Sequence, residues 1–157
     1  METQQINEPQ IITIKPATTF AFINVLPFII VTIGFLFIAY RYFPGVIWLS
    51  LGAMIFGSYR FMFIRCTVYE ITPEVIRFSR GIFFRRTDMV EMYRIKDYIL
   101  TRPFIFQVFR LMDLTLKTTD PENTVIWLRG IPLSDLVDTI RNHVQETRQH
   151  NRIYEIN

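Results

Sequence analysis

The chain has 157 residues, of which 50% are hydrophobic and 20% charged, with a net charge of +3 at pH 7 and one cysteine, Cys66. Once an apolar forepart is set aside, this length leaves room for one soluble domain of about a hundred residues. One cysteine excludes an internal disulfide framework or cysteine metal cluster, and the modest charge argues against a nucleic-acid partner.

Residues 1–19 are predominantly polar and contain Pro9 and Pro16. This composition predicts a loosely held N-terminal tail. The alternation of polar and apolar residues over Gln10–Lys15 leaves open a short strand that joins another sheet.

Two apolar segments occupy residues 20–64. Phe20–Tyr40 is an apolar run of 21 residues without a charge, and about 20 such residues cross a bilayer as a helix. Tyr42–Tyr59 is slightly short, but Arg60 can extend its charged group to the interface and let the helix continue to Phe63. Core helices of a soluble protein would show polar positions on an outward face, and these segments show almost none. We therefore predict a two-helix transmembrane hairpin, integral to the lipid bilayer.

Small residues mark one face of the second segment. Ala53 and Gly57 lie four residues apart, a spacing that lets another helix approach closely. The first apolar segment is the expected packing partner, and association between copies of the chain is the alternative.

The distribution of charge predicts the orientation of this hairpin. Arg60–Lys117 carries eleven Lys or Arg and six Asp or Glu, whereas Thr118–Asn157 carries four and six. Cytoplasmic loops are enriched in Lys and Arg near membrane spans, so both termini are expected on the cytoplasmic side. A cleaved signal peptide is the competing interpretation, but the apolar run is too long and lacks a basic leader and a cleavage site.

After the second segment the pattern changes to a period of two. Alternation over Thr67–Thr72 and again over Ile76–Ser79, with a Pro-Glu turn between them, predicts two strands. Gly81 supplies the next reversal, because glycine can adopt positive φ. Ile82–Tyr98 is rich in strand-forming residues and predicts one long bent strand or two short ones.

The second half of the body continues the β pattern. The apolar cluster Phe104–Phe109, which follows Pro103, is dense enough to belong to the core. Alternation over Asp113–Lys117 and the short apolar run Thr124–Arg129 predict further strands, with a turn over Asp120–Asn123 between them.

The chain ends with a different period. Leu133, Leu136, Val137, Ile140 and Val144 follow helical spacing, and Ser134 is placed to cap the first turn. From Gln145 onward the polar residues are expected to fray. About seven strands and one helix predict an all-β antiparallel sandwich or barrel over residues 65–150, covered by the helix and followed by a tail at 151–157.

The segment Tyr69–Asp120, YEITPEVIRFSRGIFFRRTDMVEMYRIKDYILTRPFIFQVFRLMDLTLKTTD, resembles the pleckstrin-homology-like (PH-like) domain of the bacterial YdbS-like membrane protein family. The resemblance rests on the order and spacing of the Y-x-I-T opening at Tyr69–Thr72, Gly81, the Arg94-Ile95 pair, the L-x-L-x-T run ending at Thr118, and Gly130-Ile131-Pro132 before a helix. It implies a PH-like domain behind two membrane spans in the bacterial inner membrane. Members of that family mostly lack an assigned activity.

One departure from the family concerns Arg110 and Met112. They occupy a segment where the family often has glycines, which bears on any tight turn there.

Catalytic and metal-binding patterns are not found in the sequence. His143 and His150 lie seven residues apart without a carboxylate or cysteine cluster at ligand spacing, and we interpret them as surface residues. There is no visible Ser-His-Asp arrangement and no Gly-rich phosphate loop. Asp88, Glu91 and Asp97 are interpreted as strand-edge or solvated carboxylates. We expect no enzymatic activity, no cofactor and no metal.

Four arginines around the predicted hairpin at Gly81 form the pattern that points to a function: Arg77, Arg80, Arg85 and Arg86. Basic residues near an anionic leaflet gain about 1 kcal/mol each, within a Debye length. Four of them would orient the domain on anionic phospholipid headgroups. An ordinary solvated face, which also satisfies the bias of positive charge toward the cytoplasm, is the alternative.

The main functional prediction is a membrane-anchored, non-enzymatic binding or assembly module that docks a protein partner or a second copy of the chain. A sheet edge or a groove beside the helix would receive a peptide strand. Headgroup binding by the four arginines is the alternative. A small subunit of a transport or channel complex is a further alternative, although no ionisable residue lies deep in either apolar segment.

Overall fold

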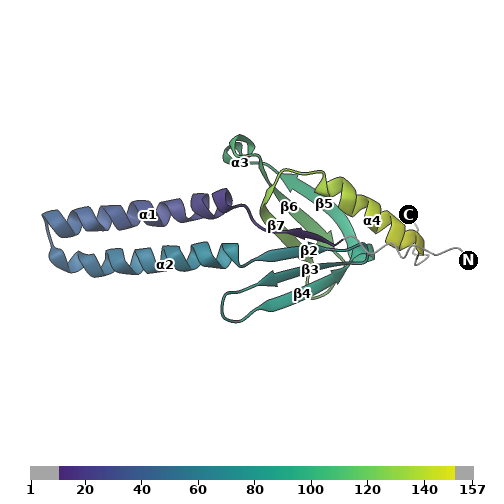
Figure 1. Cartoon of the computed structure of the whole chain (residues 1–157), viewed down its shortest axis with the longest axis horizontal. Helices are drawn as coiled ribbons and strands as arrows, with labels where there is room; N and C mark the ends of the chain where they lie inside the picture. Colours follow the sequence, from purple (N-terminus) through teal and green to yellow (C-terminus); the bar gives the residue numbers. More distant parts are fainter. Residues whose placement is uncertain (1–10, 151–157) are drawn as a thin grey trace, which may run out of the picture.

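The computed structural model describes residues 11–150 as a helical hairpin that projects from one end of a β-sandwich (Figure 1). The outer parts of the two predicted tails, residues 1–10 and 151–157, lie outside the described residues. The hairpin and the sandwich are described in turn.

The hairpin consists of α1, Thr18–Arg41, and α2, Ile47–Arg65, joined through the short 3₁₀ helix η1, Pro44–Val46. At about 1.5 Å per residue, α1 is about 36 Å long, compared with about 30 Å for the hydrocarbon core of a bilayer. The most apolar windows of the two helices are only 11% and 17% buried, whereas a core helix of a soluble protein is mostly buried. The predicted pair of long apolar helices is confirmed, and both are long and apolar enough to cross a membrane.

The two helices pack closely where glycine removes a side chain. A Cβ at Gly57 would lie 3.2 Å from the Cβ of Phe28 on α1, and Ala53 lines the same groove between the helices. Phe28 also packs against Phe56, with ring centroids 5.1 Å apart. Gly57 therefore faces α1.

The sandwich has seven strands within residues 11–150, arranged in two antiparallel sheets. The first sheet has the order β1-β2-β3-β4, with β1 at Ile12–Ile14, β2 at Val68–Ile71, β3 at Val75–Arg80 and β4 at Arg86–Glu91. The second has the order β5-β6-β7, with β5 at Ile95–Thr101, β6 at Leu111–Thr118 and β7 at Val125–Pro132. The predicted β-rich body with a C-terminal helix is confirmed.

The core lies between the sheets because alternate residues of each strand point inward. Ile71 and Ile76 of the first sheet and Leu114, Leu116 and Leu128 of the second are fully buried. Tyr69, Phe78 and Val90 belong to the same cluster. The period of two in the sequence thus specifies which face of each strand is buried.

Helix α4, Leu136–His150, closes the sandwich (Figure 1). Its apolar face, formed by Leu136, Ile140 and Val144, joins the core cluster. The expectation that the chain frays from Gln145 is wrong for residues 145–150. The Thr147 hydroxyl donates to the Pro73 carbonyl over 3.0 Å, and Arg148 Nη2 donates to the Ile95 carbonyl over 2.7 Å. These bonds hold the last turn of the helix on the body.

The start of α4 also differs from the prediction. The helix begins at Leu136, so Asp135 and not Ser134 directly precedes it. The Thr139 N–H donates to the Asp135 carbonyl over 3.1 Å. Leu133, assigned to the helical pattern, lies before the helix and is exposed.

Residues 12–14 are part of the sheet and do not belong to a loose tail. They pair antiparallel with β2, from Ile12 opposite Ile71 to Ile14 opposite Tyr69. The alternation at residues 10–15 was the correct signal, and the composition of the segment was the misleading one. The prediction of a loose N-terminal tail is therefore wrong for residues 12–14.

The segment predicted as one long or two short strands divides into two. The 3₁₀ helix η2, Met92–Arg94, separates β4 from β5. The first strand begins only at Arg86, because residues 81–85 form the turn. Gly81 has φ +119°, and a Cβ there would collide with the Phe84 carbonyl oxygen. The reversal predicted at Gly81 is present.

The cluster Phe104–Phe109 does not form part of the core as predicted. It forms a short helix, α3, at Phe104–Val108, and only Phe106 within it is buried. The Phe106 ring meets the Phe20 ring of α1 edge-on, with centroids 5.7 Å apart. A high density of apolar residues predicts burial, but a five-residue helix at the edge of the body can bury few of its side chains.

A tight turn follows α3 although the sequence has no glycine there. Arg110 adopts the left-handed conformation, with φ +53°. Its N–H donates to the Gln107 carbonyl over 3.3 Å, and its carbonyl accepts from the Leu133 N–H over 2.9 Å. These bonds stabilise a conformation that non-glycine residues rarely adopt.

Candidate functional site

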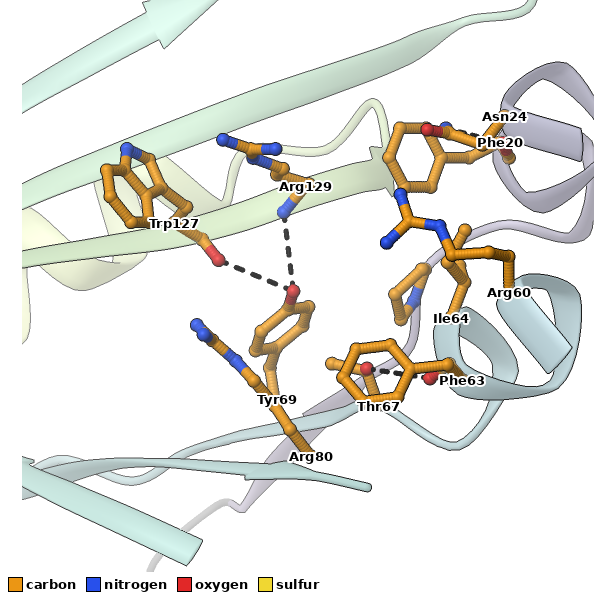
Figure 2. A pocket seen from close by; sticks show the side chains of 11 residues that line it. Phe20, Asn24, Arg60, Phe63, Ile64, Thr67, Tyr69, Arg80, Trp127 and Arg129 are labelled. Atoms are coloured by element: carbon orange, nitrogen blue, oxygen red, sulfur yellow. Dashed lines mark hydrogen bonds between the residues drawn. The ribbon is translucent and has the colours of Figure 1, made fainter. Parts of the chain in front are cut away.

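A pocket of about 270 Å³ lies where the helical hairpin meets the sandwich (Figure 2). Its walls come from both long helices and from β2, β3 and β7. The site therefore depends on how the helices are joined to the strands.

Several contacts fix this junction. The Ala17 N–H, just before α1, donates to the Gly130 carbonyl of β7 over 2.8 Å. Arg65 Nη1, at the end of α2, donates to Thr18 Oγ1 over 2.9 Å. The two helix ends on the sandwich side are thus tied to each other and to the second sheet.

Phe20 anchors α1 to the body through a glycine. Gly130 has φ +61°, and the Phe20 ring occupies the space that a Cβ at Gly130 would need. Phe20 also belongs to a small apolar cluster with Ile64, Phe106 and Leu111. This cluster joins α1, α2, α3 and β6 around the base of the hairpin.

Three arginines from three elements line the pocket: Arg60 of α2, Arg80 of β3 and Arg129 of β7. Figure 2 shows Arg60 reaching from its helix toward the sandwich, with Arg80 and Arg129 on either side of Tyr69. Arg80 lies over the Phe78 ring and Arg129 over the Trp127 ring, at 5.1 and 5.4 Å from the ring centroids. Among residues 11–150, none of the three forms an ion pair.

Tyr69 closes the floor of the pocket. Its hydroxyl donates to the Trp127 carbonyl and accepts from the Arg129 N–H, both over 3.4 Å, so it bridges β2 of one sheet to β7 of the other. Burial raises the pKa of Tyr69, although the bond from the Arg129 N–H and the charge of Arg80 oppose the rise. The phenol is therefore neutral at physiological pH.

One carboxylate acts on the same region from the neighbouring strand. Asp113 Oδ1 of β6 accepts from the Gly130 N–H over 2.6 Å. Burial raises the pKa of Asp113, while the bond from Gly130 and the charge of Arg129 lower it. The pocket thus has three guanidinium groups in its lining and one partly buried carboxyl group beside it.

The structure separates the four arginines singled out in the sequence. Arg80 lines the pocket. Arg77 is exposed and lies opposite Met89, Arg85 is exposed in the turn, and Arg86 pairs with Asp88 over 2.7 Å. They do not form one surface, and Arg80 lies instead with two arginines that are distant in the sequence.

The sequence reasoning missed Arg60 and Arg129 as site residues. The position of Arg60 was a usable signal, because a charged group near the end of an apolar helix is expected to extend beyond the apolar region. Arg129 carried no such signal, since its place in the pocket depends on how β7 packs beside Tyr69 of β2 and the helix ends. Arg60 and Arg129 come to line the same pocket only through the tertiary fold.

A second depression, of about 620 Å³, has the opposite charge. Its lining includes Glu74 from the turn before β3, Glu91 from the end of β4 and Glu146 from α4. Because β3 runs from Val75 to Arg80, this acidic depression lies at the end of the strand opposite the arginine pocket. Arg94 pairs with Glu91 over 2.7 Å at the same end, so part of this acidic charge is neutralised.

The remaining polar groups give little basis for other chemistry. Within residues 11–150, no three His, Cys, Asp or Glu residues are placed to hold a metal ion. His143 is only half-buried, but its Nδ1 is shielded from solvent and has no hydrogen-bond partner, so the surface interpretation is incomplete. His150 ends α4.

Polar side chains inside the two long helices bond to their own backbone. The side chains of Thr32, Ser50 and Ser58 donate to carbonyls three or four residues earlier, and Asn24 donates to the Phe20 carbonyl. These groups are satisfied within each helix, so they give no support to a polar pathway between the helices.

Comparison with known proteins assigns the chain to a family. Residues 20–148, which include nearly all of α1, all of α2, all but the first of the strands and most of α4, match the family described as Bacterial PH domain. No curated protein and no solved structure matches the chain. The matched range covers well over half of the sequence, and the chain belongs to the Bacterial PH domain family.

Proposed function

We propose that this protein is a membrane-anchored, non-enzymatic binding module whose junction pocket holds the headgroup of an anionic phospholipid. The observation that carries the proposal is that Arg60, Arg80 and Arg129 line one pocket without ion-pair partners in the described chain. A PH-like domain suggests a binding or assembly module, and the pocket supplies the chemistry for one.

Two features support the membrane anchor. The outward side chains of the hairpin are large and apolar, among them Ile30, Ile33 and Phe37, which water would solvate poorly. In addition, β1 precedes α1 and β2 follows α2, and the two strands pair. The chain must therefore return to the side from which it entered, as two crossings require.

The charges at the two ends of the hairpin support the orientation. Arg60 and Arg65 lie near the sandwich end of α2, whereas Arg41 alone lies near the turn at η1. This asymmetry favours a cytoplasmic sandwich and cytoplasmic termini. Together with the bacterial family, it supports a location in the inner membrane as part of this proposal. The narrower resemblance to the YdbS-like family remains a prediction.

The position of the pocket favours a lipid over a soluble anion. Its lining includes Phe20, Phe63 and Ile64 from the sandwich ends of α1 and α2, which is the level of the headgroups if the helices span the bilayer. Guanidinium groups match the geometry of phosphate oxygens and bind them with two hydrogen bonds. Phe20 and Phe63 line the same pocket and would contact the glycerol backbone and the start of the acyl chains.

The test uses Trp127 as a reporter, because it lines the pocket and Trp48 is the other tryptophan of the chain. The full chain carrying Trp48→Phe, in an uncharged detergent, is titrated with dihexanoyl phosphatidylglycerol or dihexanoyl phosphatidylcholine. We expect saturable changes in Trp127 emission with the anionic lipid, and binding weakened about fivefold by each of Arg60→Gln, Arg80→Gln and Arg129→Gln.

Arg77→Gln is the matched control, because Arg77 lies on β3 with Arg80 but is exposed outside the pocket. It should leave the titration unchanged. Equal responses to the two lipids, or a triple Arg→Gln variant that is folded and still binds, would contradict the proposal. Glycerol 3-phosphate alone, if it binds as tightly as the lipid, would identify a soluble ligand instead.

Docking of a protein partner is the second candidate function. The observation that favours it is that β4 ends its sheet, so one edge of this strand is unpaired within the described chain, with Met89 exposed beside it. A peptide strand added there would bind through backbone hydrogen bonds. A partner that crosslinks to position 89 in intact cells would support this candidate, and a partner lost on Arg129→Gln would instead assign it to the pocket.

A further inference from the structure

Two exposed apolar projections on the sandwich have no role in the pocket. The first is the tip of the β3–β4 hairpin, where Phe83 and Phe84 are 86% and 93% exposed. The second is α3, where Phe104 is 79% exposed and Ile105, Val108 and Phe109 are at least half exposed. We propose that these projections, the Phe83–Phe84 tip and α3, insert into the headgroup region of the bilayer and seat the domain on it.

Their positions in the fold support this inference. Figure 1 shows the tip and α3 on opposite sides of the helical hairpin, each reaching the level at which α1 and α2 meet the sandwich. Phe106 fixes α3 there by packing against Phe20 in the first turn of α1. Arg80, at the base of the tip, lines the junction pocket with Arg60 of α2.

The side chains of α3 divide into two sets with different environments. Phe106 is buried against α1, and the Gln107 side chain donates to the Arg102 carbonyl over 3.0 Å. The other apolar residues of α3 are at least half exposed. A five-residue helix has little stability of its own, so the contact through Phe106 holds the exposed set in a fixed position next to the helical hairpin.

Basic residues flank both projections. Arg85 and Arg86 follow the Phe83–Phe84 tip, and Arg102 and Arg110 flank α3; all four are exposed. Arg86 is paired with Asp88. Aromatic residues next to basic ones are typical of segments that lie in the interface of an anionic bilayer. The charge is therefore complementary to a cytoplasmic leaflet.

This arrangement favours a lipid surface over a protein partner. The projections lie on opposite sides of the hairpin, so a single partner would have to reach around both helices, whereas a bilayer crossed by the helices meets both at once. The inference rests on the proposed membrane anchor but not on headgroup binding in the pocket.

The experiment places single tryptophans in the full chain, reconstituted in bilayers of phosphatidylglycerol and phosphatidylcholine that contain lipids brominated near the top of the acyl chain. Phe84→Trp and Phe104→Trp are made separately in the Trp48→Phe and Trp127→Phe background. We expect blue-shifted emission and strong quenching at both positions. The Glu122→Trp variant is the control, because residue 122 is exposed in the turn after β6, at the end of that strand away from α3. It should show neither effect.

A fourth sample tests the membrane anchor separately from this inference. Trp48, retained in a Trp127→Phe variant, lies exposed on α2 near η1. Failure of brominated lipid to quench Trp48 would overturn the anchor and this inference with it. If Trp48 is quenched but the tryptophan at position 84, at position 104 or at both is not, the two-point seating alone would be overturned. An unquenched emission that shifts with protein density in the bilayer would assign the surface to a second copy.

Discussion

Large apolar side chains are buried in the β-sandwich but exposed along the helical hairpin. In the sandwich, Ile71, Leu114 and Leu128 are fully buried between two sheets, while in the hairpin, Ile33 and Phe37 lie more than half exposed along the helices. The same residue types therefore report two different environments. The sandwich buries its apolar side chains in its own interior, whereas the outward side chains of the hairpin would leave water only in apolar surroundings such as a bilayer.

The largest expected difference between the two regions concerns leucine truncation. Leu114→Ala, in the core of the sandwich, should lower the free energy of unfolding by about 2–5 kcal/mol, because it removes buried contacts and leaves a cavity. Leu26→Ala, on the exposed side of α1, should cost less than about 0.5 kcal/mol. Urea unfolding of the full chain in detergent micelles, followed by near-ultraviolet circular dichroism, compares the two. Similar costs would show that the outer face of α1 is packed in the native protein.

Sequence periodicity anticipated most of this contrast. A period of two located the strands and the buried face of each, and the uncharged run starting at Phe20 located α1 to within a few residues. Composition failed where apolar residues are exposed on the sandwich. The Phe104–Phe109 cluster looks like core by content, but whether it is covered depends on where Pro103 and Arg110 direct the chain.

The pocket was anticipated only in part, because its residues are distant in the sequence. Arg80 was singled out beside three arginines that the structure places elsewhere, and its neighbours in the pocket are Arg60 and Arg129. The sequence indicates where a strand runs but not which strands and helix ends border a common pocket. A site assembled from a helix and two strands of different sheets therefore requires the tertiary structure.

The second prediction tests the junction between the two regions. Gly130→Ala should lower the free energy of unfolding by about 2–4 kcal/mol, since alanine is strained at φ +61° and its Cβ would displace the Phe20 ring. Gly34→Ala is the matched control in α1, where an added Cβ meets nothing within 4 Å and helix propensity improves by up to about 1 kcal/mol. Thermal unfolding in micelles measures both changes. A neutral Gly130→Ala variant would show that the contact of Phe20 with β7 is dispensable.

The smallest effect concerns pH and belongs to the sandwich alone. Burial raises the pKa of Asp113, so the folded chain binds more protons than the unfolded chain between the ordinary and the raised pKa values. The contribution of Asp113 to stability is therefore greatest below its ordinary pKa and decreases as the pH rises through the folded value. Asp113→Asn keeps an acceptor for the Gly130 N–H but cannot ionise. We expect it to gain stability relative to the unmodified chain as the pH rises from about 3 to about 7. Urea midpoints that change in parallel for both chains would contradict this assignment.

The pairing of β1 with β2 has a consequence for how the protein is made. The two strands are neighbours in the sheet, but residues 15–67, which contain both long helices, separate them in the chain. During synthesis β1 leaves the ribosome first, and its partner β2 follows only after both long helices. If the two helices span a bilayer, as proposed above, the sheet can acquire this strand only after both helices have crossed. On that proposal, completion of the sandwich depends on correct insertion: a chain whose second helix failed to return would leave β1 and β2 on opposite sides of the bilayer, unable to pair.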